Sequence, residues 1–187
     1  MKKIFLIIAA AALSFAASAQ GAKFAYVNYT ELVQLMPEAD QARAQIDAQS
    51  LEFEETYQGM IEEFQTKSQQ YQQKASTWTA AIRESKEKEL TDIQNRIQEF
   101  QQTASAELQQ SQQSLMAPIQ EKALQTVEQL AKDGGYTCVF EVSSVLYLDK
   151  NQCTDLTPAA RKALNIPEGR TIESLQEELL AAQQARQ

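Results

Sequence analysis

The sequence predicts an α+β protein, in which a long antiparallel helical hairpin rests on a small β-sheet body that closes into a barrel by oligomerisation. Between Pro37 and Gly134 only Gly59 and Pro118 interrupt a chain rich in Gln, Glu, Ala, Lys and Leu. These residue types lose little entropy in a helix. Two stripes of large side chains at three- and four-residue spacing fill this stretch, separated by polar residues 83–88. Short β-rich runs precede and follow it, so they meet where the two ends of a hairpin come together.

The N-terminus has the pattern of an export signal. Lys2 and Lys3 precede an apolar run, which ends in the small residues Ala17-Ser18-Ala19. This pattern predicts a signal peptide over residues 1–19, cleaved before Gln20. The apolar run is shorter than the ~20 residues that span a bilayer. We therefore expect export to a soluble extracytoplasmic compartment, the alternative being an uncleaved anchor.

Composition excludes several classes of function. Without Lys2 and Lys3 the chain has 15 basic and 25 acidic residues, a net charge of −10, which argues against nucleic acid as a partner. The sequence has no histidine and no glycine-rich phosphate loop. The carboxylate pairs at 54–55 and 62–63 are typical of a solvated helix face rather than of acid–base or cation chemistry. We expect no enzyme activity, no cofactor and no metal.

The body is expected to come from residues 20–36 and 116–164. Strands are predicted over residues 23–27, 136–142 and 145–148. Asn28 with Glu31 has the spacing of a capping box at the start of a short helix, Thr157 is suited to cap another, and Gly134-Gly135 to end the long one. Three strands from one chain leave unpaired edges, which neighbouring copies would complete. The predicted oligomer interface comprises Phe24, Tyr26, Val27, Val139, Val145 and Tyr147.

The arm is expected over residues 37–115, with its tip near 75–86 and a C-terminal helical extension over 165–187. Gly59 and Pro118 are candidate hinges, because each weakens helix continuity. The two cysteines, Cys138 and Cys153, either form a disulfide, as an oxidising compartment favours, or stay as unpaired thiols.

The order of several segments resembles the Skp/OmpH family of periplasmic outer-membrane-protein chaperones. The resemblance covers about Lys23 to Leu164 and rests on these pieces in order: Val27-Asn28, the long hairpin, Leu115-Met116-Ala117-Pro118-Ile119, Gly135-Tyr136, Val145-Leu146-Tyr147 and Asp155-Leu156-Thr157. It implies a homotrimer, in which strands form a central barrel and helical arms enclose a cavity. It also implies that unfolded outer-membrane proteins are held there without ATP. Two features depart from the family: this chain is acidic where the family resemblance implies a basic protein, and it continues past the usual end near residue 165.

On this interpretation, client binding is expected along the arm and its tip, at Phe53, Tyr57, Met60, Phe64, Tyr71, Trp78 and Ile82. Residues 67–88 carry five basic against two acidic side chains. The tip is thus the basic, aromatic part of an acidic protein and suits contact with a membrane surface or with acidic client segments. The alternative for Trp78 and Ile82 is simple packing at the end of the coiled coil. Two other functions remain open: a structural coiled-coil tether or spacer of the cell envelope, and a regulator that binds one folded partner.

Overall fold

The computed structural model describes residues 22–185, so the expected signal peptide lies outside the described residues. The chain divides into two compact units. We call residues 22–34 with 122–185 the body, and residues 35–121 the arm. The boundary at 121–122 falls within a single helix, α4 (Ala80–Gly134).

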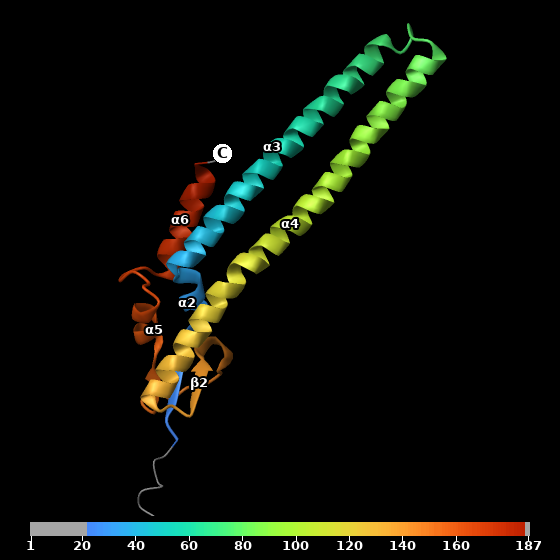
Figure 1. The fold of residues 1–187 in the computed structure, drawn as a ribbon. Coiled ribbons are helices and arrows are strands. Elements are labelled where there is room, and N and C mark those ends of the chain that lie inside the picture. The colour runs from blue at the N-terminus through green and yellow to red at the C-terminus, as the bar shows by residue number, and fades with distance from the viewer. Residues whose placement is uncertain (1–21, 186–187) are drawn as a thin grey trace, which may run out of the picture. The chain divides into compact units, whose positions relative to one another are not determined.

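The body contains a three-stranded sheet with strand order β2-β1-β3 (Figure 1). The strands are β1 (Phe24–Val27), β2 (Cys138–Glu141) and β3 (Cys153–Asp155), and β1 pairs in parallel with both neighbours. The strand predicted at residues 145–148 is wrong. A 3-10 turn, η1 (Val142–Ser144), follows β2, and the third strand begins at Cys153 instead.

Hydrogen bonds at the first residues of two body helices connect segments that are distant in sequence. At α2 (Tyr29–Leu35), the Asn28 side chain accepts a hydrogen bond from the Glu31 backbone N–H at 3.1 Å, which confirms the predicted N-cap. The Asn28 backbone N–H instead donates to the Thr157 hydroxyl at 3.0 Å. Thr157 is therefore not the cap of α5 (Thr157–Ala163), whose cap position is Leu156, and its hydroxyl ties β1 to the start of α5.

The core of the body lies on one face of the sheet. Ala25 and Val27 of β1 are buried, while Phe24 before them and Tyr26 between them point to the opposite face. The other buried side chains of the body come from its helices and from the residues on either side of α5. They are Leu32, Val33, Ala123, Val127, Leu156, Ala160, Leu164, Ile166 and Leu175. A small apolar core of this kind stabilises the sheet from one side only.

Within the body, Arg161 connects the C-terminal extension, which begins at residue 165, to helix α2. Its guanidinium pairs with the Glu31 carboxylate and donates to the backbone oxygens of Pro167 and Arg170. The last helix, α6 (Ile172–Gln184), begins with a capping box between Thr171 and Ser174. Its Leu175 is buried, whereas every side chain from residue 176 to 185 is exposed.

The arm is a helical hairpin of α3 (Pro37–Lys74) and the first part of α4, joined by a turn at residues 75–79 (Figure 1). Phe53 meets Phe100 and Lys67 meets Glu89 across it, which is the pairing of antiparallel helices. The predicted combination of a helical hairpin and a small sheet is thus confirmed. No helix within residues 22–185 is long and apolar enough to cross a membrane.

The end of α4 has the predicted glycine cap. Gly135 has φ +66°, and the N–H groups of Gly135 and Tyr136 donate to the carbonyls of Lys132 and Ala131 at 3.1 and 2.9 Å. This left-handed termination needs glycine because it has no Cβ. Pro118 lies within α4, which continues through it.

Candidate functional site

The seam between the two arm helices is apolar but poorly covered. Along it, α4 contributes the buried side chains of Ile93, Ile97 and Ala104. From Arg43 in α3, through the turn, to Asp92 in α4, no side chain is buried. The predicted client-binding residues of α3 are therefore all partly accessible: Phe53, Tyr57, Met60, Phe64 and Tyr71. A long apolar seam that remains half-exposed has surface left over for another chain.

A groove opens between the helices near the middle of the arm. Its volume is ≈ 460 Å³, and Phe53 and Tyr57 of α3 face Phe100, Ala104 and Leu108 of α4 across it. The Phe53 and Phe100 rings meet edge to face with centroids 5.9 Å apart. We call this feature the arm groove; its remaining lining residues are Ser50, Glu54, Gln101 and Ser105.

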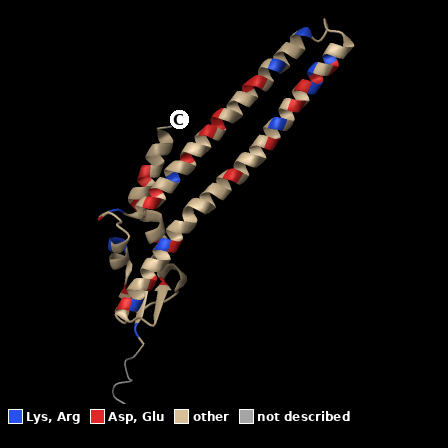
Figure 2. Ribbon diagram, viewed as in Figure 1, with Lys and Arg blue, Asp and Glu red and all other residues tan. Residues whose placement is uncertain are grey.

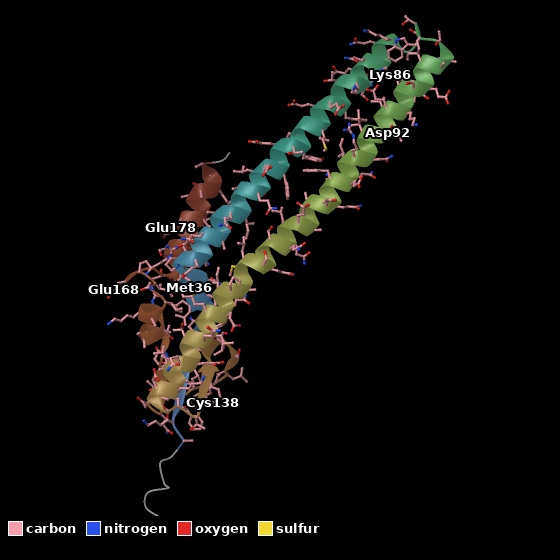
Figure 3. The ribbon with its side chains drawn as sticks, in the orientation of Figure 1. Met36, Lys86, Asp92, Cys138, Glu168 and Glu178 are labelled. Carbon is pink, nitrogen blue, oxygen red and sulfur yellow. The ribbon has the colours of Figure 1, made fainter. Side chains whose placement is uncertain are left out.

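Closer to the tip, polar side chains join the helices. Glu89 of α4 accepts hydrogen bonds from Lys67 of α3 and from Lys86. The hydrogen bond from Lys67, followed by that from Lys86, lowers the pKa of Glu89 to about 2. Glu63 pairs with Arg96 at 3.2 Å, and the Tyr71 hydroxyl donates to Glu87, a bond that raises the pKa of Tyr71. These bonds fix the register of the hairpin where its apolar seam is thin. Figure 3 shows the stretch of α4 that carries Lys86 and Asp92.

At the turn, the two predicted tip residues lie in different surroundings. The Trp78 ring packs edge-on against Tyr71 with centroids 5.9 Å apart. Ile82 is 43% exposed. Four of the five basic side chains of this region are also exposed, namely Lys74, Arg83, Lys86 and Lys88. Trp78 thus contributes to the end of the hairpin, and Ile82 to its surface.

The predicted interface residues of the body lie on different faces. Register pairing places Phe24 with Cys138 and Cys153, and Tyr26 with Phe140 and Asp155. Paired residues point to the same side of a sheet, so these six form one surface, which we call the open face. Phe24 and Phe140 contact each other there and are 39% and 37% exposed. Val27 is instead buried on the helix-covered face, and Val139, which pairs with Ala25, points the same way.

The segment after β2 exposes apolar residues. Leu146 is fully exposed and Tyr147 is 82% exposed, whereas Val145 and Leu148 are partly covered. These residues belong to no strand of the described chain. The sequence predicted a strand here, so the lack of a strand partner for these residues was not expected.

Both cysteines are free thiols, so the unpaired alternative is the one that the structure has. Cys138 and Cys153 flank Phe24 on opposite sides in the same register. Two strand spacings amount to ~9.6 Å between their Cα atoms. A disulfide requires less than about 7 Å, so the bond would have to break the sheet.

Gly59 and Pro118, the candidate hinges, both lie inside helices and are exposed. A Cβ added at Gly59 would meet nothing within 4 Å. Among residues 22–185, no group of three or more His, Cys, Asp or Glu is placed to hold a metal ion. The wall of the arm groove on α4, with Phe100 and Leu108, was not singled out from the sequence as functional. The feature of the sequence that could have identified this wall is the second apolar stripe, which lies opposite the first in a helical hairpin.

Comparison with known proteins connects this architecture to a family. The family described as "Outer membrane protein (OmpH-like)" matches residues 23–164. The chain is also 30% identical over 145 residues to the chaperone protein Skp of Yersinia enterocolitica, an alignment that covers 75% of this chain and 86% of that protein. The match spans the body strands and the whole arm, and it ends before the C-terminal extension. The chain therefore belongs to the OmpH-like family.

Proposed function

We propose that this protein is an ATP-independent holdase chaperone of the periplasm, which binds unfolded outer-membrane proteins and keeps them from aggregating. Family membership and the likeness to a chaperone support the proposal. The observation that carries it is the half-exposed seam of the arm, where Phe53, Tyr57, Met60 and Phe64 remain accessible to another chain. Many weak contacts of this kind slow aggregation of an unfolded strand without a deep pocket.

The working form in this proposal is a homotrimer. The sheet has two edge strands, β2 and β3, and an open face with exposed aromatic rings. Edge strands and apolar faces of this kind are satisfied when neighbouring copies pair with them. The number three comes from the family, in which the arms surround a common cavity. Of the predicted interface residues, Phe24, Tyr26, Val145 and Tyr147 remain in the proposed interface, whereas Val27 is buried in the core of the body and Val139 points to the same face as Val27.

The proposed location and mode of action follow from the N-terminus and the composition. An export signal over residues 1–19 would deliver the mature chain to the periplasm. Binding and release there need no nucleotide, because the outer membrane is a better environment for the client than the arms. The tip, with exposed Ile82 and four exposed basic side chains, is the proposed point of weak contact with the membrane surface.

An aggregation assay tests the proposal. An unfolded outer-membrane β-barrel protein is diluted from denaturant with the mature chain at a stoichiometric ratio of trimer to client, and light scattering is followed. We expect scattering to be suppressed for several unrelated barrel proteins, with no nucleotide added. A folded protein of similar acidity at equal mass serves as control. Scattering equal to that control would refute the holdase function, and capture of one dominant folded partner instead would favour an envelope tether.

A further inference from the structure

The arm groove lies in the most acidic part of the arm. Residues 44–66 of α3 contain six carboxylates and no basic side chain, and the facing residues 97–113 of α4 contain two carboxylates and no basic side chain. Figure 2 shows this stretch of α3 with red ribbon segments and no blue ones, whereas blue segments lie nearer the tip and nearer the body. An apolar groove in such surroundings favours an occupant that carries positive charge.

Three of these carboxylates lie within two residues of the groove residue Phe53. Glu54 lines the groove itself, and Glu52 and Glu55 are exposed within the same turn of α3. Glu54 accepts a hydrogen bond from Gln58 at 2.7 Å. Among residues 22–185, no Lys or Arg forms an ion pair with any of the three. The carboxylates nearer the tip differ, because Glu63 and Glu89 are paired with Arg96 and Lys67.

The dimensions of the groove suit an extended chain. Its wall on α3 runs from Ser50 to Tyr57, about 10 Å at 1.5 Å per residue. An extended chain advances about 3.3 Å per residue, so about three residues fit along it, and the first and third point to the same side. Two apolar side chains can therefore enter the groove, while the residue between them faces outward, from where a long Lys or Arg side chain can reach back to Glu54 in the groove wall.

We propose that the arm groove binds an extended segment of an unfolded chain in which apolar side chains alternate with Lys or Arg. The inference rests on the proposed chaperone function and names the client chemistry that the arm selects. Membrane-spanning β-strands have the required alternation, with apolar residues on one side and polar residues on the other. In this acidic family member, clients with basic residues at the polar positions are preferred over clients with acidic ones.

A second copy of the arm is a poorer occupant. Its own middle section is equally acidic, so two arms that met at their grooves would place carboxylates against carboxylates. Like charges in contact cost binding free energy, and they direct the groove toward a partner of opposite charge.

Two peptides test the selectivity directly. Both have about ten residues, the length of one membrane strand, and both alternate Leu and Tyr with a charged residue: Lys in one and Glu in the other. Fluorescence anisotropy with the full mature protein should show the Lys peptide binding about tenfold more tightly near 50 mM salt. The preference should shrink several-fold at 500 mM salt, because the charges are screened.

A matched pair of variants locates the effect. Glu52→Gln, Glu54→Gln and Glu55→Gln together remove the charge in the groove wall and two exposed charges of the same helical turn, and should reduce the preference to less than about twofold. The control Glu128→Gln, Glu168→Gln and Glu177→Gln removes three exposed charges of the body and should keep the preference. A photo-crosslinking residue at Ser105, in the groove wall, should capture the Lys peptide, whereas one at Ser76, in the turn, should not.

Equal affinity for the two peptides, a preference that survives in the groove variant, or crosslinking at Ser76 alone would each overturn the inference. The proposed function is tested separately by suppression of barrel-protein aggregation. A protein that suppresses aggregation but shows no peptide selectivity remains a chaperone without this client preference. A protein that fails the aggregation assay loses both.

Discussion

Gly59 and Gly135 show how one residue type has opposite roles in the same molecule. Gly59 lies in regular helix with open space around its Cα, whereas Gly135 has φ +66° after the last turn of α4. Gly59→Ala should stabilise the protein by about 0.5–1 kcal/mol, because alanine loses less backbone entropy in a helix. Gly135→Ala should destabilise it by about 1–2 kcal/mol, because a Cβ is strained in the left-handed region.

Urea unfolding of the two variants, followed by circular dichroism, measures these changes. Gly135→Asn is the control, since asparagine tolerates the left-handed region better than alanine and should lose less stability. If Gly59→Ala and Gly135→Ala shifted the midpoint in the same direction, the assignment of the helix end at Gly134-Gly135 would be contradicted.

Glu89 makes the stability of the arm depend on pH. In the folded chain, hydrogen bonds from Lys67 and then Lys86 hold its pKa at about 2, against an ordinary value of 4.5. Between these values the unfolded chain binds more protons at this site than the folded chain. The stabilisation by Glu89 is therefore present above about pH 4.5 and is lost as the pH falls toward 2.

The variant Glu89→Gln isolates this effect. At pH 7 it should melt at a lower temperature than the unchanged protein, and the difference should shrink steadily as the pH is lowered from 5 toward 2, as measured by thermal circular dichroism. Glu128→Gln is the control, because Glu128 contacts Lys132 at 3.5 Å on an exposed surface, where such pairs contribute little. A melting difference for Glu89→Gln that did not change with pH would rule out its titration as the cause.

At the scale of elements, the helices could be predicted from the sequence and one strand could not. The long helices follow from the absence of breakers over about a hundred residues and from two apolar stripes, and Gly134-Gly135 marks their end. β3 was missed because Cys153-Thr154-Asp155 follows a polar loop and has no alternation. What defines it is its pairing with β1 and the hydrogen bond from the Leu156 N–H to the Tyr26 carbonyl at 2.9 Å, both contacts distant in sequence.

The wrongly predicted strand at residues 145–148 illustrates the complementary error. Val145, Leu146 and Tyr147 have high β propensity, yet propensity measures how well a residue fits a sheet that already offers an edge. Here β2 and β3 occupy both sides of β1, and residues 145–148 pair with neither outer edge of the sheet. In a single chain Leu146 and Tyr147 therefore remain exposed. On the arm, the sequence pointed to the residues of α3 that are proposed to bind clients, but not to Phe100 and Leu108, which line the groove on α4.

The thin seam of the arm predicts unequal protection of its amides. In α3, no side chain from Arg43 to Lys74 is buried, whereas β1 has Ala25 and Val27 buried and strands on both sides. In hydrogen exchange with mass-spectrometric detection, peptides from residues 45–70 should exchange at least about tenfold faster than peptides from β1. Gly59→Ala should slow exchange in residues 45–70 and leave β1 unchanged. Equal protection of the two regions would show that the arm is as firmly packed as the body.

For the whole molecule, the open face of the sheet decides whether the chain works alone. Ala25 and Val27 use one side of the sheet for the core of the body, while Phe24 and Phe140 remain exposed on the other. An exposed aromatic surface beside two unpaired edges is a cost for a single chain and a source of stability for an assembly. The assembly was predicted from strand edges, but the residues of the open face became clear only from the register of β1 with β2 and β3.

Phe140→Asp tests this conclusion, because it adds a charge on the open face at a position that the single chain already leaves 37% exposed. The folded chain should tolerate the change, whereas an assembly that buries Phe140 would have to desolvate a carboxylate and should dissociate. Light scattering should give three times the mass of the mature chain for the unchanged protein and close to one for the variant, with helical circular dichroism retained in both. Leu179→Asp, on the exposed part of α6, is the control and should keep the assembled mass. A Phe140→Asp protein that stayed assembled would place the interface elsewhere, and an unchanged protein that was a stable single chain would leave the arms without a cavity to enclose.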